Sequence, residues 1–367
     1  MAYSNTTGNT KINVDQLISY AYRDAGITAE EMTPEYVDAG KQALFYNLQN
    51  LSNRGVNLWL LENKLVGAVT AQQYLTLPAT TIDVRESNWV YIINSEADEY
   101  LPVANPDSPA VFAQNLDLVS TSTSGNNWFG LYYQGGQSVY YVGFNGYATG
   151  GGTQTYNFAY ETSTDGITWT TVLQLPETTL SDREWAYFPI SITPVGTFYR
   201  LRETVATTFS LRQIVYSTSQ QVIPLARLNR DDYWNLPNKQ FPSQRSLQFW
   251  FDRQIEPKMY LWPVPNNDFQ MFQLLIEVQM QDVGMLTNEL YLPDRWLNSV
   301  QSSLSHRLAM QLPGIDLARV QYLEGQADKL FLQASDEERD KSPIYFQPNI
   351  SYYTRWPAHI KWHTITL

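Results

Sequence analysis

A long stretch without any charged side chain is the feature of this sequence that most constrains its fold. Residues 118–160 contain no Asp, Glu, Lys or Arg, yet they are rich in Trp, Tyr and Phe. Gly-rich turns, at 135–136, 150–152 and 165–166, separate segments of alternating pattern at intervals of about 8–12 residues, the spacing of an antiparallel sandwich. Prolines flank the region, as at a domain boundary: Pro102, Pro106, Pro109 and Pro224. We therefore expect an inserted all-β domain over residues 100–221.

The same region holds a hairpin pattern, YETSTDGITWTTV, followed by two strands that each carry an arginine. The residues of this pattern are Tyr160, Ser163, Asp165, Gly166 and Trp169, with Tyr199-Arg200 and Leu211-Arg212 in the later strands. It resembles the discoidin-type jelly roll, whose members often bind sugars or lipid headgroups, with occasional calcium. The resemblance implies a jelly-roll sandwich, for which the candidate glycan face is Trp128, Tyr132 and Tyr133. Alternating Tyr and Phe are equally typical of a sandwich core, so both interpretations stay open.

Two apolar stripes near the C-terminal end predict a pair of helices. Trp296, Val300, Leu304, Leu308 and Leu312 recur at four-residue steps. A second stripe follows the break at Pro313-Gly314: Leu317, Val320, Leu323, Ala327, Leu330, Phe331 and Ala334. Two helices joined by a tight break form a hairpin. Its predicted core is Trp296, Leu304, Leu308, Leu323 and Leu330.

The remaining segments complete an α+β fold. Helical faces begin at Val14 and at Pro34, and strands are expected near residues 74–93, 247–262 and 272–280. The predicted architecture is a helical core of N-terminal helices, a C-terminal helical hairpin and a small antiparallel sheet, with the jelly-roll sandwich inserted in it. The corresponding domains are a discontinuous core of residues 1–99 and 222–367, which includes a C-terminal extension of residues 349–367, and the insert of residues 100–221.

Composition excludes several classes of site. Charged residues make up 16% of the chain and the net charge is −12, which argues against a general phosphate-binding surface. Cysteine is absent, so neither a disulfide nor a thiolate metal site can form. The first ten residues lack the pattern of a signal peptide. No apolar run reaches about 18 residues, so we expect no membrane-spanning helix.

Searching for catalytic groups gives none that stands out. His359 and His363 have the spacing of two metal ligands on one helical turn, but lack a third ligand, so packing is the better interpretation. Asp182 and Glu184 could flank a glycosidic bond, although a surface loop fits them better. No phosphate-binding loop or nucleophile motif occurs. We therefore predict a protein that is not an enzyme, with no cofactor and no metal.

A second resemblance covers roughly residues 11–95 and 222–348. An aromatic-Pro turn, WPVP from Trp262, leads through a strand and LPDRW to an RLAMQL helix, and then to a helix ending in ASDEERDKSP. This pattern resembles the head-to-tail adaptors of short-tailed, podovirus-type phages, also called tail tubular protein A or gatekeeper. The resemblance implies a viral structural protein, made in the host cytoplasm and located in the virion at the neck. There, a connector ring of twelve copies would join the portal protein to the tail nozzle protein.

The adaptor resemblance also implies that the ring lines the channel for genome ejection. Double-stranded DNA would pass without sequence recognition, and an acidic lumen would repel its phosphates. Candidate inter-subunit contacts are Glu337, Glu338, Arg339, Arg355, Trp356 and Trp362. The insert could contact a tail fibre, and no membrane contact is expected. The alternative function is a lectin-like tail module that binds host-surface glycans; a glycan-cleaving enzyme is disfavoured because no paired acids are evident.

Overall fold

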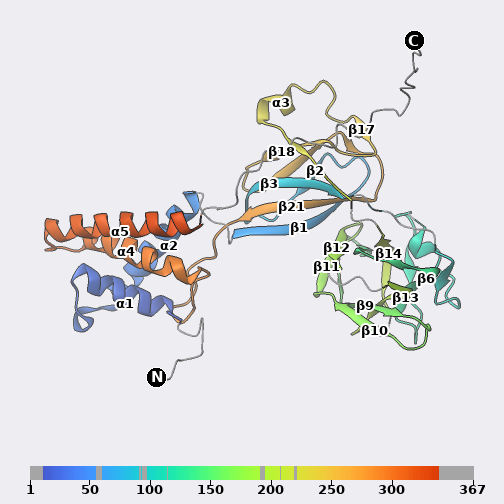
Figure 1. The fold of residues 1–367 in the computed structure, drawn as a ribbon, viewed down its shortest axis with the longest axis horizontal. Helices are drawn as coiled ribbons and strands as arrows, with labels where there is room; N and C mark the ends of the chain where they lie inside the picture. Colours follow the sequence, from blue (N-terminus) through green and yellow to red (C-terminus); the bar gives the residue numbers. More distant parts are fainter. Residues whose placement is uncertain are drawn as a thin grey trace, which may run out of the picture. The chain divides into compact units, whose positions relative to one another are not determined.

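The computed structural model describes residues 11–54, 60–90, 92, 97–113, 115–190, 195–206, 208–218 and 221–338. The chain divides into two compact units, one of residues 1–57 with 282–367 and the other of residues 58–281. Helices dominate the first unit and strands the second (Figure 1). The protein is therefore a mixed α+β protein with largely antiparallel sheets. The predicted division at residues 100 and 221 stays a prediction.

The helical unit brings together segments from both ends of the chain. Its elements are α1 (Val14–Ala25), η1 (Ala29–Glu31), α2 (Pro34–Asn53), α4 (Asp294–Gln311) and α5 (Leu317–Glu338). Asn13 begins α1 with a capping box, because its side chain accepts from the Gln16 amide at 2.8 Å. Gly26 ends the helix in the left-handed region, at φ 111°.

Helices α4 and α5 form the hairpin at the centre of this unit. Trp296, Leu304 and Leu308 of α4 and Leu323 of α5 are buried, whereas Leu330 is only half-buried. The ring of Trp296 lies against Phe331, with 5.8 Å between the ring centroids. Because α5 packs along one stripe only, large apolar side chains remain exposed on it and at the end of α4: Met310, Leu317, Tyr322 and Leu332.

The second unit contains a sandwich of two antiparallel sheets. The larger sheet has the order β10-β9-β13-β6-β4 and the smaller has the order β12-β7-β14-β5. Their strands are β4 (Glu99–Leu101), β5 (Ser120–Thr121), β6 (Trp128–Ser138), β7 (Tyr141–Gly146), β9 (Phe158–Ser163), β10 (Thr170–Gln174), β12 (Trp185–Pro189), β13 (Val195–Glu203) and β14 (Ser210–Ser217). A separate pair joins β8 (Thr153–Tyr156) to β11 (Thr178–Ser181), and η3 (Ala110–Phe112) packs near β14. This topology gives the jelly-roll type of sandwich that the hairpin pattern predicted.

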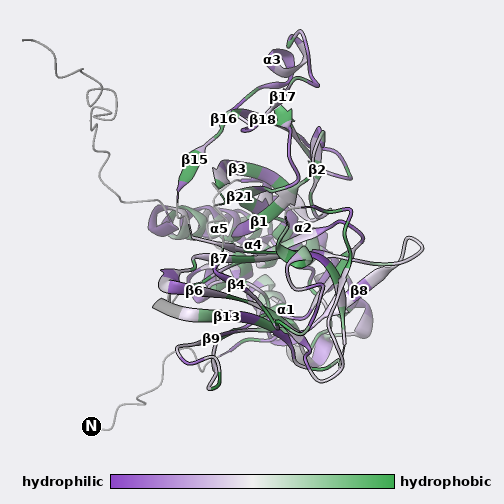
Figure 2. Ribbon diagram, turned by 90° about the vertical axis from the view of Figure 1, so that its right-hand side faces the viewer, coloured by the Kyte–Doolittle hydropathy of each residue, from purple (hydrophilic) through white to green (hydrophobic). Residues whose placement is uncertain are grey.

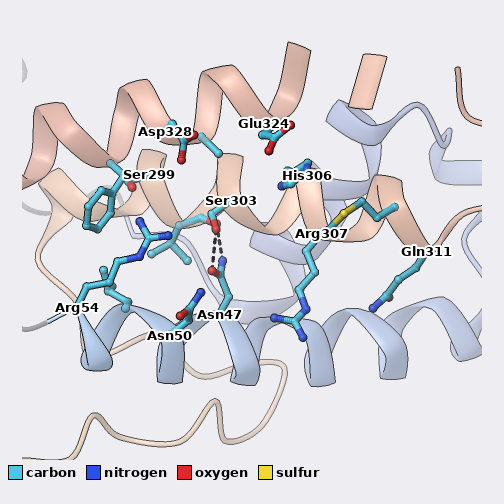
Figure 3. Close-up of a pocket in the computed structure, with 15 residues that line it drawn as sticks. Asn47, Asn50, Arg54, Ser299, Ser303, His306, Arg307, Gln311, Glu324 and Asp328 are labelled. Carbon is cyan, nitrogen blue, oxygen red and sulfur yellow. Dashed lines mark hydrogen bonds between the residues drawn. The ribbon is translucent and has the colours of Figure 1, made fainter. Parts of the chain in front are cut away.

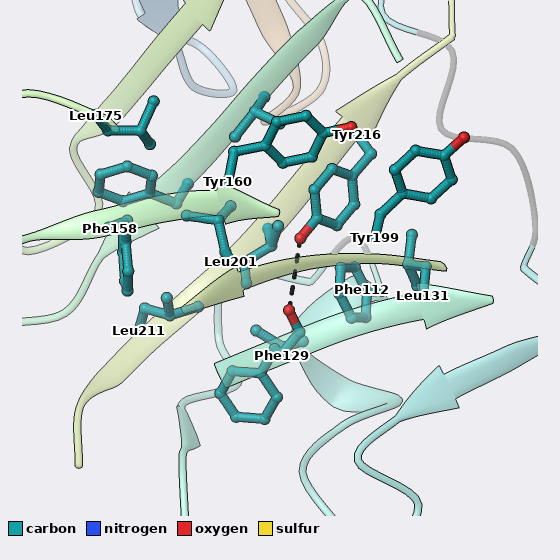
Figure 4. Close-up of a cluster of buried hydrophobic side chains, with 14 of the residues drawn as sticks. Phe112, Phe129, Leu131, Phe158, Tyr160, Leu175, Tyr199, Leu201, Leu211 and Tyr216 are labelled. Carbon is teal, nitrogen blue, oxygen red and sulfur yellow. Dashed lines mark hydrogen bonds between the residues drawn. The ribbon is translucent and has the colours of Figure 1, made fainter. Parts of the chain in front are cut away.

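Aromatic side chains fill the space between the two sheets (Figure 4). Tyr160, Tyr199 and Tyr216 are fully buried, and the Tyr216 hydroxyl donates to the Phe129 carbonyl at 3.5 Å. Burial raises the pKa of Tyr160 and of Tyr216 well above the ordinary value, so both hydroxyls stay neutral. Figure 2 colours the sandwich strands by hydropathy, and hydrophobic and hydrophilic residues both occur along β13. The uncharged stretch thus supplies much of this core.

Two further sheets complete the second unit. One has the order β1-β21-β3-β15, from β1 (Leu61–Ala68), β3 (Thr81–Val90), β15 (Val222–Pro224) and β21 (Gln270–Val278). The other has the order β16-β18-β19-β2, from β2 (Tyr74–Thr76), β16 (Ala226–Arg227), β18 (Gln248–Asp252) and β19 (Lys258–Trp262). A short parallel pair joins β17 (Pro242–Ser243) to β20 (Val264–Pro265), and α3 (Arg230–Trp234) contacts β18.

The sandwich packs against the sheet of β1 and β21 through β12. Trp185 and Tyr187 stack with 5.0 Å between their centroids, and the Trp185 ring nitrogen donates to the Asp268 carbonyl at 3.0 Å. Gly67 of β1 allows this approach, because a Cβ there would lie 2.4 Å from the Trp185 Cβ. Contacts of this kind explain why the sandwich falls within one larger unit.

Candidate functional site

The outer side of the larger sandwich sheet carries a group of aromatic and guanidinium side chains, which we call the outer aromatic face. Its members are Trp128, Tyr132, Trp169, Phe198, Arg200 and Arg202. Register explains the grouping: Trp128 lies opposite Arg202, and Tyr132 lies opposite Phe198 with 4.6 Å between the ring centroids. All four rings are half-buried, so each keeps part of its surface in solvent.

One residue of the predicted glycan face, Tyr133, does not lie on that face, because side chains alternate between the two sides of a strand. Trp128 and Tyr132 point outward from β6, but Tyr133 is only 3% exposed and belongs to the sandwich core. Neighbouring residues of a strand project to opposite sides, so Tyr132 and Tyr133 cannot share a face. Burial raises the pKa of the Tyr133 hydroxyl, which is consistent with a core position. Contact of Trp128 and Tyr132 with a glycan stays a prediction.

Arg200 occupies the centre of the face. Its guanidinium carbon lies 4.0 Å from the centroid of the Trp169 ring and 5.2 Å from that of Trp128. The two indole rings are 5.7 Å apart and inclined at 51°. Both indoles therefore make cation–π contacts with one side chain, which fixes their orientation. Gly130 allows the close approach, because a Cβ there would be 3.3 Å from the Trp128 ring.

A buried carboxylate holds the arginines in place. Glu161 of β9 accepts from Arg200 Nε at 2.6 Å and from Arg202 Nη2 at 2.6 Å, and its side chain is 4% exposed. Thr171 adds a hydroxyl at 3.2 Å. Burial alone would raise the pKa of Glu161, but the hydrogen bonds from Arg202 and Arg200 outweigh it and hold the pKa below its ordinary value. Two guanidiniums share one carboxylate, so the cluster of Arg200, Arg202 and Glu161 carries one surplus positive charge.

A tight turn presents Trp169 to the face. Asp165 accepts from the amides of Ile167 at 2.8 Å and Thr168 at 2.7 Å, and from the Ser163 hydroxyl at 2.8 Å. These backbone hydrogen bonds, with that of Thr168 first, lower the pKa of Asp165. Gly166 adopts φ 71°, which favours glycine, and a Cβ there would be 3.2 Å from the Phe198 ring. The hairpin motif thus orders the loop that carries Trp169.

A groove in the helical unit is a second candidate (Figure 3). Its volume is about 470 Å³, and α2, α4 and α5 line it. Arg54 stacks on Phe331 at 4.2 Å and Arg307 on Tyr46 at 5.0 Å, and within the described residues neither guanidinium forms an ion pair. On the α5 side, Glu324 and Asp328 are exposed and, among the described residues, also lack an ion-pair partner. The groove is therefore lined by both positive and negative side chains.

A cavity of about 720 Å³ near β3 and β21 is a weaker candidate. Trp89, Phe269 and several amides line it. The Gln270 amide donates to the Gln244 carbonyl at 2.8 Å and to Asn267 at 3.0 Å, and its oxygen accepts from the Trp89 ring nitrogen. Because these polar groups already bond to one another, the cavity offers a ligand few free partners.

The predicted inter-subunit residues are placed unequally. Glu337 is exposed on α5, but the Glu338 side chain is 1% exposed and accepts from Arg295 Nε at 2.7 Å and from the Trp296 ring nitrogen at 3.3 Å. Glu338 therefore joins α4 to α5 within one chain, which corrects its assignment as an inter-subunit contact. The other inter-subunit candidates lie outside the described residues: Arg339, Arg355, Trp356 and Trp362. The same holds for His359 and His363, the pair with the spacing of metal ligands.

The remaining sequence candidates are part of ordinary structure. Asp182 accepts two hydrogen bonds from Arg212, both at 2.9 Å, and Glu184 accepts from the Ser181 amide at 2.9 Å. Among the residues that the structure describes, no cluster of three or more His, Asp or Glu is arranged to hold a metal ion. Nor does the described part contain a helix that is long and apolar enough to cross a membrane.

No protein-family model matches the chain, and no curated protein matches its sequence. Among solved structures, the CBM32 of AlyQ in complex with 4,5-unsaturated mannuronic acid is 13% identical, with a TM-score of 0.29, and the match covers 35% of this chain and 99% of that one. A CBM32 module produced by Clostridium perfringens is 12% identical (TM-score 0.29; 35% and 100% covered). The F5/8 type C domain of a Bacteroides fragilis protein is also 12% identical (TM-score 0.26; 41% and 99% covered). Scores this low carry no conclusion about ligand or partner.

Proposed function

We propose that this protein binds a saccharide on the outer aromatic face of its sandwich. One observation carries the proposal: the partly exposed rings of Trp128 and Trp169 lie around the guanidinium of Arg200, and the partly exposed pair of Tyr132 and Phe198 lies on the same side of the sheet. Sugar rings present apolar C–H surfaces edged by hydroxyl groups. Aromatic rings bury such surfaces, and a guanidinium donates hydrogen bonds to oxygen atoms beside them.

The core of the sandwich does not account for these rings. The inner side of the same sheet has a complete aromatic core of its own, which includes Phe129, Tyr160 and Tyr199. The rings on the outer side are only half-buried, so part of their surface stays in contact with solvent. Partly exposed aromatic groups on such a surface are typical of recognition sites.

The role that we propose is binding without catalysis. Glycoside hydrolysis needs two carboxylates on opposite sides of the scissile bond. Near this face, Glu161 bonds to two arginines and Asp165 bonds to the amides of its own turn. Glu99, which lies opposite Tyr132 on β4, therefore has neither of them as a free second acid.

Trp128→Ala is expected to weaken saccharide binding by about 30-fold, since a central aromatic anchor contributes about 2 kcal/mol or more. A glycan array identifies the ligand, and calorimetry compares the affinities of the variants. Trp234→Ala is the matched control, because this Trp lies on α3, away from the face, and is 57% exposed. Equal affinities for wild type and Trp128→Ala, with unchanged melting temperatures, would rule out this face as the site.

For the helical unit we propose a second candidate function, assembly as a head-to-tail adaptor. The favouring observation is the apolar surface on the hairpin, where Leu317, Tyr322 and Leu332 are exposed along α5. Exposed large apolar side chains on one helix mark surfaces that meet other proteins. The twelve-membered ring, the portal and nozzle partners, the DNA channel and the location in a virion belong to this proposal.

Tyr322→Glu is expected to prevent incorporation of the protein into virus particles while leaving its melting temperature unchanged. The ring of Tyr322 is 67% exposed, so its loss costs little in the free chain, but a charge there would be buried in an interface. Quantitative immunoblotting of purified particles measures incorporation. Gln333→Glu places the same charge at another exposed position of α5 and should be incorporated normally. Normal incorporation of Tyr322→Glu would exclude this surface from the assembly.

A further inference from the structure

We infer that the saccharide recognised by the outer aromatic face is an acidic one, in which a carboxylate or another acid group pairs with Arg200 and Arg202. The inference rests on the proposed saccharide binding and adds the class of ligand. Its basis is the surplus of one guanidinium over the single carboxylate at the centre of the face.

The donors that remain free indicate where an acid group would bind. Arg200 gives its Nε to Glu161, and Arg202 gives its Nε and Nη2 to the same carboxylate. The remaining N–H groups, on both terminal nitrogens of Arg200 and on Nη1 of Arg202, have no acceptor among the described residues. A planar guanidinium edge is well matched to the two oxygens of a carboxylate, so these donors can receive an acid group directly.

The indole rings cover part of the Arg200 guanidinium. Trp169 and Trp128 lie over the guanidinium of Arg200, whose side chain is 14% exposed. The Arg202 side chain is 33% exposed and borders the same surface. A ligand must therefore approach the rings and the free N–H groups together. A pyranose that bears an acid group offers both parts, an apolar ring surface and an anion at its margin.

Among the described residues, no carboxylate other than Glu161 forms an ion pair with Arg200 or Arg202, so the surplus is that of the Arg200–Arg202–Glu161 cluster alone. Asp165 is occupied by its turn, and Glu203 accepts from the amides of Asn157 at 3.0 Å, Thr204 at 3.1 Å and Val205 at 3.2 Å. The net charge of −12 repels an anion at long range. At physiological ionic strength this repulsion is screened within about 8 Å, whereas charge-assisted hydrogen bonds act at contact.

A neutral saccharide fits the face less well. Its contact with the rings would withdraw water from the free guanidinium N–H groups and supply no anion in exchange. Removing a charged group from water without a counter-charge is unfavourable. The surplus charge therefore favours acidic saccharides over neutral ones.

The test uses the full chain and matched polymers. The probes are polygalacturonate, alginate and hyaluronate as carboxylated saccharides, dextran sulfate as a sulfated one, and dextran and fully methyl-esterified polygalacturonate as neutral ones. We expect the acidic polymers to bind at least about tenfold more tightly than the neutral ones in calorimetry, and methyl esterification to abolish the advantage. The carboxylated and sulfated polymers distinguish which acid group the arginines prefer.

Variants connect the preference to the face. Arg202→Gln should make the affinity for polygalacturonate nearly equal to the affinity for its methyl ester, so that the ratio of the two is close to one. Arg183→Gln also removes one positive charge from the sandwich, but Arg183 pairs with Asp117 away from the face, so the ratio should persist. Arg202→Lys restores the positive charge but not the planar guanidinium with its paired N–H donors. It should therefore recover part of the difference in affinity.

The possible failures are distinguishable. If neutral saccharides bind as tightly as acidic ones, or if Arg202→Gln and Arg183→Gln lower the ratio equally, the inference is overturned while saccharide binding stands. If neither these polymers nor a broad glycan array gives binding, the proposed function fails together with the inference.

Discussion

Trp296→Ala is expected to lower the free energy of unfolding of the helical unit by about 3–5 kcal/mol, the cost of removing a large aromatic side chain from a core. Trp296 has no exposed surface, and its ring contacts Phe331 of α5. Its ring nitrogen also donates to the buried carboxylate of Glu338 at 3.3 Å. The substitution therefore leaves a cavity and removes a donor from a buried anion, and both effects are destabilising.

Urea unfolding followed by far-ultraviolet circular dichroism measures this loss, because the helices dominate that signal. Leu332→Ala is the matched control on α5: its side chain is 58% exposed, so the change should stay within about 0.5 kcal/mol. A loss below about 1 kcal/mol for Trp296→Ala would mean that Trp296 does not anchor the hairpin.

The helical hairpin could be predicted because its signal is local. A four-residue repeat of apolar side chains determines which side of a helix is buried, and Trp296, Leu304 and Leu308 are all on that side. Leu330 shows the limit of the argument. It belongs to the same stripe of α5, but it is only half-buried, because α5 has packing partners along a narrow band.

Glu338 and Tyr133 show what local patterns leave undetermined. Glu338 lies in a run of charged residues that is typical of a solvated helix end, yet its partner Arg295 is 43 positions earlier in the chain. Alternation along a strand already separates Tyr133 from Tyr132, but packing, and not the local sequence, decides which of the two neighbours faces the core. Both outcomes depend on tertiary packing, which overrides local preference.

The sequence proposes Trp128 and Tyr132 as part of a glycan face, but the arginines at its centre lie beyond sequence reasoning for a similar reason. Arg200 and Arg202 are two residues apart on β13 and therefore project to the same side of the sheet. Their common partner Glu161 is 39 and 41 positions away, and only the register of β9 with β13 brings the three together. Trp169 was recognised as part of the hairpin motif, but not as a member of a site.

Glu161→Leu is expected to lower the free energy of unfolding of the sandwich-containing unit by about 3 kcal/mol, at the low end of the cost of breaking a buried ion pair. Two arginines would then lie side by side without a counter-charge. Arg202 can turn toward solvent, but Arg200 is held beneath two indoles. Tryptophan fluorescence during urea unfolding measures the loss. Glu177→Leu, an exposed acid on the same sandwich, should change stability by about 0.5 kcal/mol at most.

We expect the Glu161 carboxylate also to make the free energy of unfolding depend on pH in the acid range. The pKa of Glu161 in the folded chain lies below its ordinary value of 4.5, so the folded state binds fewer protons than the unfolded state in this range. The stabilisation is therefore complete above pH 4.5 and is lost as the pH falls through the lowered pKa. Glu161→Gln lacks this titration, so the stability gap between wild type and Glu161→Gln should be widest near about pH 6 and should narrow toward about pH 3. Because all other carboxylates titrate alike in both proteins, a gap of constant size would show that the charge of Glu161 does not stabilise the fold.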